Sequence, residues 1–242
     1  MDSRVLTYRL LTPANLVTFC SLACGLLLVD QAVGGRLEYL GLLFTACLIC
    51  DGLDGFVARK MRTSSEFGAE VDSLTDAIAF SFVPMIVAGS YVGFPADALF
   101  YCLRVLYVVC AVIRLAKFNL QENKSIFLGL NTPSSAALIV FFIWIVRAHS
   151  NIMSRDTAIL VLEGLIACVS FSMVMPVKYI SSKSLKLKFN RVTVGLGVVL
   201  LALSAAYAPF SIYAYILAYA LSGPLLALYW FAVRALRRLS AK

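Results

Sequence analysis

The chain has 242 residues, of which 61% are hydrophobic, and its mean hydropathy is +0.89. Soluble domains are only about 45–50% apolar, so this composition excludes an ordinary soluble domain and indicates an integral membrane protein. The net charge of +8 does not indicate a nucleic-acid-binding protein, because the basic residues cluster at the ends of apolar stretches and not along one polar face.

The apolar stretches, taken in chain order, predict an all-α, polytopic transmembrane helix bundle. Residues 2–12 mix Arg4 and Arg9 with apolar side chains, which is the pattern of a short amphipathic helix on the membrane surface. Pro13 then begins a new direction. About eight spans follow, each close to the roughly 20 residues that cross the hydrocarbon layer: 14–33, 37–60, 68–92, 96–119, 131–149, 155–176, 190–208 and 210–236. We expect residues 1–242 to form one domain.

The distribution of lysine and arginine predicts the orientation of this bundle. If the N-terminus is cytoplasmic, most of the 21 basic residues fall on the cytoplasmic side, whereas Arg36, Arg147 and Arg155 fall outside. Cytoplasmic loops of membrane proteins carry an excess of Lys and Arg. We therefore expect a multi-pass protein of the cytoplasmic membrane, with its N-terminus in the cytoplasm.

The stretch from Cys50 to Phe80 concentrates acidic residues between two apolar runs. Carboxylates at the ends of membrane helices are costly to keep and are functional candidates by default. The most informative four are spaced three and four residues apart, so that each pair shares one face of its helix: Asp51 and Asp54, and Asp72 and Asp76. Four such carboxylates do not all stay ionised without a cation, and oxygen ligands suit Mg²⁺, Mn²⁺ or Ca²⁺. The alternative is a buried acid network without a metal.

These residues also carry a family resemblance. All eight positions of the signature of the CDP-alcohol phosphotransferases are filled at the family's spacing, in Asp51-x2-Asp54-Gly55-x2-Ala58-Arg59-x8-Gly68-x3-Asp72-x3-Asp76. The resemblance implies that an alcohol attacks the β-phosphorus of a CDP-linked lipid and releases CMP. It also implies a homodimer and a divalent metal cofactor, two ions of Mg²⁺ or Mn²⁺, with Ca²⁺ as the alternative. The cluster would then face the cytoplasm, where soluble substrates arrive.

The resemblance further assigns roles to individual residues. It makes Asp76 the general base for the attacking hydroxyl, and it makes four residues metal ligands: Asp51, Asp54, Asp72 and Asp76. We expect the CDP-lipid to contact Asn15, Thr18, Gly55, Ala58, Arg59, Ser65 and Gly68. Gly68 opens the third span, where free backbone amides favour an anion. For Asn15 and Thr18, which match the family's first-span pattern with one extra residue, the alternative is hydrogen bonding between helices.

Three later stretches indicate which alcohol is the acceptor. Residues 114–119, 128–137 and 173–183 resemble segments of the serine-using members of the family, the phosphatidylserine synthases. We therefore expect CDP-diacylglycerol as donor and L-serine as acceptor, with serine or a lipid phosphate held by Arg114, Lys117 and Asn119. The alternative for Arg114 and Lys117 is a role as positive anchors at the membrane surface.

Other functions stay open on the sequence alone. The lipid could be CDP-archaeol, which would make the product archaetidylserine, or the acceptor could be glycerol phosphate or inositol phosphate. A more distant alternative is an ion-coupled transporter, although the acids lie at one side of the membrane and not at its middle. The single histidine, His149, and the lack of paired HxK motifs argue against a covalent phosphatidyl-enzyme.

Two charged residues lie inside apolar spans, away from the acidic stretch. Arg104 and Glu163 each fall eight residues after the expected start of a span, which places both about 12 Å below the same membrane surface. Isolated charges at that depth are costly, so we expect the two side chains to pair, directly or through a polar neighbour. The alternative is that Arg104 extends toward the headgroups while Glu163 is protonated.

Overall fold

The computed structural model describes residues 11–93, 97–120, 127–149, 151–179, 210–211 and 213–224. Its elements are α2 (Pro13–Val33), α3 (Leu40–Lys60), α4 (Glu66–Asp76), the π-helix η1 (Ala77–Phe82), α5 (Val83–Val92), α6 (Ala98–Asn119), β1 (Phe127–Leu128), α7 (Thr132–Ala148), α8 (Arg155–Val174) and β2 (Lys178–Tyr179). A further helical stretch runs over residues 213–224.

The helices confirm a multi-pass helical membrane protein. Among the described residues, five helices are long and apolar enough to cross a membrane: Pro13–Val33, Leu40–Lys60, Glu66–Val92, Ala98–Asn119 and Arg155–Val174. The apolar helix α7, expected as a span over 131–149, has 17 residues. The expected surface helix at 2–12 and the span at 190–208 lie almost wholly outside the described residues, as does the end of 210–236. The count of eight spans therefore stays a prediction.

Capping side chains explain where most of these helices begin. The first turn of a helix has backbone N–H groups without a helical partner, and a side-chain oxygen just before the helix accepts from one of them. The residues that do so are Thr12 for α2, Ser65 for α4, Asp97 for α6, Asn131 for α7 and Ser154 for α8. Pro13 occupies the first turn of α2, where its missing N–H costs nothing.

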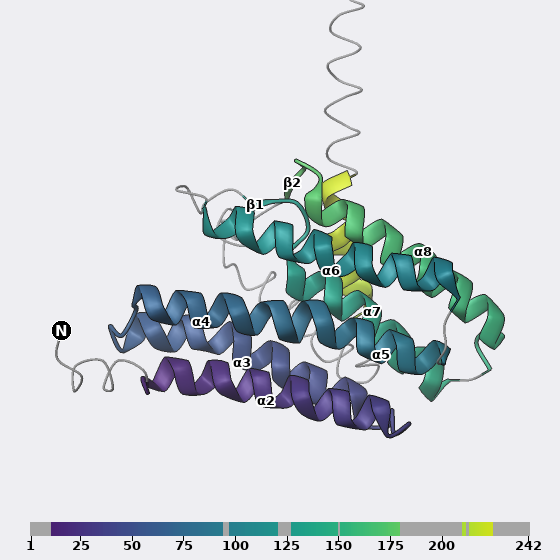
Figure 1. The fold of residues 1–242 in the computed structure, drawn as a ribbon, viewed down its shortest axis with the longest axis horizontal. Coiled ribbons are helices and arrows are strands. Elements are labelled where there is room, and N and C mark those ends of the chain that lie inside the picture. Colours follow the sequence, from purple (N-terminus) through teal and green to yellow (C-terminus); the bar gives the residue numbers. More distant parts are fainter. Residues whose placement is uncertain are drawn as a thin grey trace, which may run out of the picture.

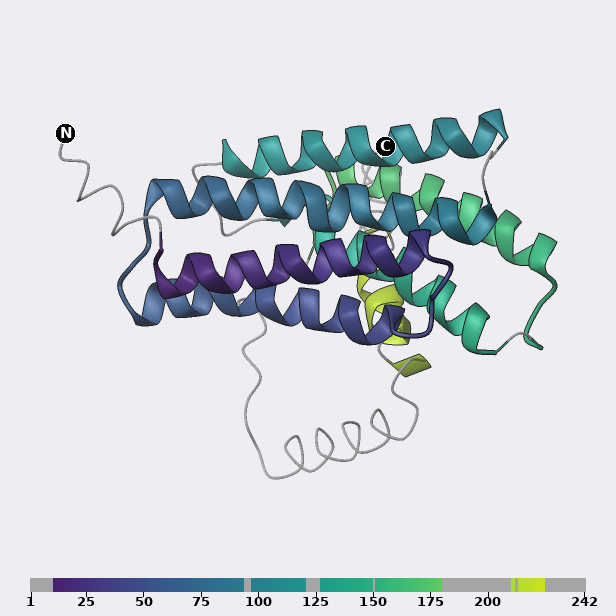
Figure 2. The ribbon, with the colours of Figure 1, turned by 60° about the horizontal axis from the view of Figure 1, so that its bottom comes forward.

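The helices form a bundle in which α4, η1 and α5 make one continuous central rod. Helix α2 packs along α3, α4 and α5, while α6 packs against α8 and η1, and α7 against α3, α5 and α8 (Figures 1 and 2). Phe44 joins three of these elements: its ring meets Phe80 of η1 edge-on at 6.1 Å and Phe141 of α7 at 5.7 Å. The core of the bundle therefore lies between α3, η1 and α7.

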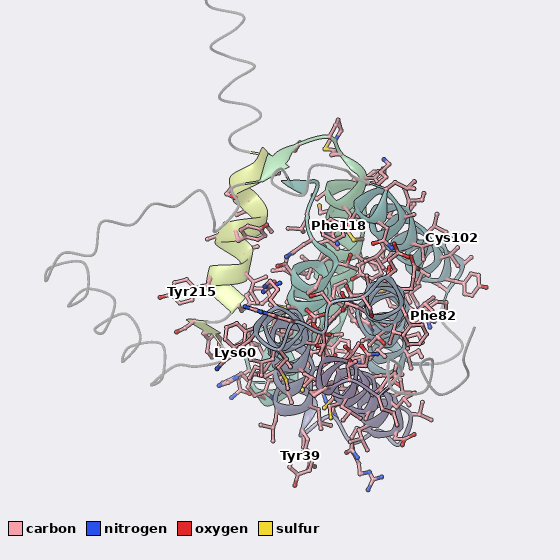
Figure 3. All side chains as sticks on the ribbon, turned by 90° about the vertical axis from the view of Figure 1, so that its left-hand side faces the viewer. Tyr39, Lys60, Phe82, Cys102, Phe118 and Tyr215 are labelled. Carbon is pink, nitrogen blue, oxygen red and sulfur yellow. The ribbon has the colours of Figure 1, made fainter. Side chains whose placement is uncertain are left out.

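Large apolar side chains also cover the outside of the bundle. Tyr39, Phe82 and Cys102 point away from the helices at its periphery (Figure 3), and all three are exposed. Exposed apolar side chains recur along α2, α3 and α6, including Leu16, Phe19, Leu26, Leu42, Ile49, Leu53, Val105 and Val109. An apolar exterior of this extent is expected of helices that face lipid.

A break in the regular helix follows Asp76 directly. The π-helix η1 runs from Ala77 to Phe82, and Pro84 lies in the first turn of α5. Because proline has no N–H, the carbonyl of Phe80 loses the partner that an α-helix would give it. The fully buried hydroxyl of Tyr107 donates to that carbonyl at 3.0 Å. Helix α6 thereby supports the backbone four residues beyond Asp76.

Replacing Tyr107 with phenylalanine is expected to lower the free energy of unfolding by about 1–3 kcal/mol, because the carbonyl of Phe80 would lose a buried hydrogen-bond donor. The measurement is thermal or denaturant unfolding of the purified chain in detergent. Tyr101→Phe is the matched control, since Tyr101 lies on the same helix but is 62% exposed. Equal losses for the two variants would show that the hydroxyl of Tyr107 is not what stabilises this region.

The expected pair between Arg104 and Glu163 is not formed. Glu163 interacts electrostatically with Asp97, and Arg104 with the hydroxyl of Tyr101. No ion pair joins Arg104 to Glu163 in the part of the chain that the structure describes. The reason is geometric: equal depth along α6 and α8 does not fix the direction in which each side chain points around its helix.

Candidate active site

The four aspartates of the acidic stretch meet where α3 and α4 run antiparallel. Asp51 lies within hydrogen-bonding distance of Asp76, and Asp54 lies likewise beside Asp72. Three residues on one helix and four on the other each advance the chain by about one turn, so each helix presents two carboxylates to the other. One carboxylate oxygen from each of Asp51, Asp72 and Asp76 lies within 4.8 Å of the others.

This cluster fits a divalent cation. The Oδ1 atom of Asp76 is buried and has no hydrogen-bond partner among the described residues. A buried carboxylate oxygen without a donor is costly unless a positive group meets it. Three oxygen ligands this close are suited to a hard ion such as Mg²⁺ or Mn²⁺. The structure therefore brings three of the four expected ligands into one group.

Asp54, the fourth expected metal ligand, accepts a hydrogen bond from a neighbouring helix. Its side chain is 6% exposed and accepts a hydrogen bond of 2.7 Å from the Thr18 hydroxyl of α2. Thr18 thus bonds a neighbouring helix, which was the alternative reading of that residue. This bond fixes α2 against the acidic face of α3.

A cavity of about 290 Å³ opens beside the acids, between α2, α3 and α4. All seven residues expected to contact the CDP-lipid line it, together with Asp54 and Asp72: Asn15, Thr18, Gly55, Ala58, Arg59, Ser65 and Gly68. Sequence reasoning missed four further lining residues, Ala14, Thr63, Ser64 and Ala69. The hydroxyl of Thr63 is buried without a hydrogen-bond partner in the described structure. A run of hydroxyl residues between two acidic helices was the signal that could have found it.

The two glycines of the cavity keep space for a ligand. A Cβ atom at Gly68 would lie 3.1 Å from Oδ1 of Asn15, and one at Gly55 would lie 3.3 Å from the guanidinium of Arg59. The amide of Gly68 is not free, as we had expected it to be, because it donates to the Ser65 hydroxyl at 3.0 Å. Ser65 is therefore the cap of α4 as well as a cavity residue.

Of the three residues expected to hold serine or a lipid phosphate, Arg114 is the one that interacts with the acidic cluster. It is 7% exposed, and its guanidinium donates to the Thr132 hydroxyl at 2.9 Å. It interacts electrostatically with Asp76 and with the hydroxyl of Tyr219, from the helical stretch 213–224. Nothing in the sequence had indicated Tyr219, which lies about a hundred residues further along the chain.

The other two expected acceptor residues lie further out. Lys117 is exposed in the last turn of α6. Asn119 ends that helix and donates to the Ser73 hydroxyl of α4 at 2.9 Å. Asn119 therefore ties α6 to α4, next to the acidic face.

The turn that precedes α7 positions Thr132. The Gly129 amide donates to the carbonyl of Val177 at 2.8 Å, and the Leu130 amide donates to the carbonyl of Ser172 at 3.0 Å. Gly129 has a φ of +79°, and a Cβ atom there would clash with the carbonyl of Met173. Glycine is the residue that tolerates both conditions. The partner of Arg114 is thus anchored on the end of α8.

Comparison with known proteins finds a matching family model and several relatives. The family model described as CDP-alcohol phosphatidyltransferase matches residues 11–169. A Helicobacter pylori protein (strain J99) named CDP-diacylglycerol–serine O-phosphatidyltransferase is 34% identical over 175 residues, which cover 71% of this chain and 73% of that protein. Proteins of the same name are 33% identical over 141 residues in Methanocaldococcus jannaschii (58% of this chain, 65% of that protein) and 27% identical over 126 residues in Bacillus subtilis (52% and 71%).

Proposed function

The chain belongs to the CDP-alcohol phosphatidyltransferase family, and from this premise we propose that it transfers a phosphatidyl group from CDP-diacylglycerol to L-serine. The products would be phosphatidylserine and CMP. The observation that supports the choice of acceptor is that the buried Arg114 interacts electrostatically with Asp76, so that a carboxylate-binding cation accompanies a candidate base. The names of the relatives in Helicobacter pylori and Methanocaldococcus jannaschii support the same choice.

The cavity between α2, α3 and α4 is the proposed site of the CDP group. Gly55 and Ala58 leave room for the nucleotide, and Arg59 can donate two parallel hydrogen bonds to a phosphate. The unpartnered hydroxyl of Thr63 offers a further donor. A divalent cation, or two, held by Asp51, Asp72 and Asp76 with Asp54 alongside, would neutralise the pyrophosphate and favour the departure of CMP.

The serine would bind on the other side of the acids, at Arg114. A serine whose carboxylate meets the guanidinium has its hydroxyl directed toward the neighbouring Asp76. The carboxylate of Asp76 accepts the hydroxyl proton while the serine oxygen forms its bond to the β-phosphorus. The bond from that phosphorus to the CMP oxygen breaks, and CMP leaves with the electron pair. The hydroxyl of Tyr219, which also interacts electrostatically with Arg114, would line the same serine-binding pocket.

The remaining expected residues take positions at the edge of this site. We propose that Lys117, exposed at the end of α6, meets a lipid phosphate, and that Asn119 acts through its bond to Ser73. The distribution of basic residues supports a cytoplasmic site in the cell membrane, and the family resemblance supports a homodimer of this single domain.

The test of this function is CMP release by the purified full chain in detergent, supplied with CDP-diacylglycerol, Mg²⁺ or Mn²⁺ and one alcohol at a time. Release with L-serine should exceed release with glycerol 3-phosphate or inositol phosphate by at least about tenfold, because those acceptors lack the carboxylate for Arg114. EDTA should abolish the activity. Preference for a phosphorylated acceptor would overturn serine, and release that persists in EDTA would overturn the metal.

A further inference from the structure

We propose that the end of the bundle opposite the aspartates carries a second binding site, which takes the phosphate group of a phospholipid headgroup. The site is a cavity of about 380 Å³, larger than the one beside the acids. Its lining residues take no part in the proposed reaction: Gly35, Leu37, Ser90, Tyr91, Val146, Arg147, Met153 and Arg155.

The position of this cavity separates it from the reaction. It lies between the turn before α3, the ends of α5 and α7, and the start of α8. The ends of these helices lie toward the right of the bundle in Figure 1. The aspartates lie toward the other end of α3. Asp51 is eleven residues beyond Leu40, the first residue of α3, which is about 17 Å along the helix axis.

Two guanidinium groups converge on this cavity. Arg147 comes from the last turn of α7 and Arg155 from the first turn of α8, and both interact electrostatically with the hydroxyl of Tyr91. Arg155 is held in place by a hydrogen bond of 3.2 Å to the carbonyl of Val92. Arginine and tyrosine are donors here, so the polar part of the cavity is suited to an anion.

The positive charge of the cavity is not compensated within the described structure. Neither Arg147 nor Arg155 forms an ion pair with a described carboxylate. Glu38 shares a smaller adjoining cavity of about 210 Å³ with Arg147, but it does not pair with that side chain. Two like charges that face one space repel each other, and an anion between them would remove that cost. The planar fork of arginine matches the geometry of a phosphate in particular.

The rest of the cavity favours a lipid over a soluble anion. Leu37, Val146 and Met153 form an apolar wall next to the guanidinium groups. A ligand that satisfies both parts has a phosphate attached to an apolar body. The ends of membrane helices, where this cavity lies, are at the level of the lipid headgroups. These observations together point to a headgroup phosphate with its glycerol or upper chain against the apolar wall.

The test adds defined probes to the purified full chain in a neutral detergent. Binding of each probe is measured as the shift in the melting temperature of the protein. The probes are phosphatidylglycerol, diacylglycerol as a lipid without phosphate, and inorganic phosphate as a phosphate without lipid. We expect phosphatidylglycerol to bind more tightly than either of the others. Arg147→Gln should weaken its binding by about tenfold or more, because a charge-assisted hydrogen bond is lost.

Arg36→Gln is the matched control, because Arg36 lies at the same end of the bundle but does not line the cavity. It should leave binding unchanged, and both variants should retain serine-dependent CMP release. Arg155→Lys, which keeps the charge but removes the fork, should also weaken binding. If Arg36→Gln weakened phosphatidylglycerol binding as much as Arg147→Gln does, general surface charge would explain the binding and the proposal would be wrong. Diacylglycerol or inorganic phosphate binding as tightly as phosphatidylglycerol, or no binding of any probe, would also overturn the proposal.

Discussion

Asp76→Asn is expected to lower kcat for CMP release by about 10³-fold, because an amide cannot accept the proton of the attacking hydroxyl. The side-chain oxygen that remains can still face a cation, so the affinity for CDP-diacylglycerol should change little. The measurement pairs steady-state release of CMP with direct binding of the CDP-lipid to the detergent-purified chain. The structural basis is the buried Oδ1 atom of Asp76, which has no hydrogen-bond partner among the residues that the structure describes.

Glu70→Gln provides the matched control for this experiment. Glu70 lies on the same helix, α4, but is exposed and lines neither the acidic cluster nor the cavity. Removing its charge should leave kcat within about twofold of the original, as is usual for a surface substitution. If Asp76→Asn kept a tenth or more of the original turnover, Asp76 would not be the base.

Arg114→Ala is expected to raise the KM for serine by about 10–100-fold, while the KM for the CDP-lipid stays nearly constant. The reason is that a charged hydrogen bond to the serine carboxylate is worth about 1.5–3 kcal/mol, which corresponds to this range. Arg114→Lys should recover only part of the loss, because a lysine keeps the charge without the planar fork. The measurement is initial-rate kinetics with each substrate varied in turn.

Two further variants separate the role of Arg114 from general charge. Thr132→Val removes the acceptor of its 2.9 Å hydrogen bond and should raise the KM for serine to a smaller extent. Lys60→Ala removes an exposed cation at the same end of the bundle and should leave that KM unchanged. A parallel rise in the KM of both substrates for Arg114→Ala would instead assign Arg114 to the lipid phosphate or to the scaffold.

Most of the acidic site could be predicted because its residues are close in the sequence. A single helical turn separates Asp51 from Asp54, and another separates Asp72 from Asp76, so local periodicity already placed each pair on one face. The lining of the cavity beside the acids also lies largely within residues 54–72. What periodicity could not supply was the pairing of Asp51 with Asp76, which depends on how α4 returns alongside α3.

The acceptor side of the site depends on contacts between distant segments. Thr132 and Tyr219 reach Arg114 from two other helices, and no local pattern links residues so far apart. The contact that accompanies the π-helix after Asp76 was equally hidden, because the carbonyl of Phe80 meets the hydroxyl of Tyr107 from another helix. The error over Arg104 and Glu163 has the same origin, since depth is readable from sequence but rotation about a helix axis is not.

The turn before α7 is held by residues that lie beyond the end of the family match. The family match stops at residue 169, yet the carbonyls that hold this turn belong to Ser172 and Val177. Main-chain bonds of this kind do not depend on the identity of the side chain that the donor or acceptor residue carries. The contacts that hold the turn therefore extend beyond the residues that the family model matches. A fragment trimmed to residues 11–169 would keep the four clustered aspartates but lose the carbonyls that hold the turn next to Thr132, the partner of Arg114.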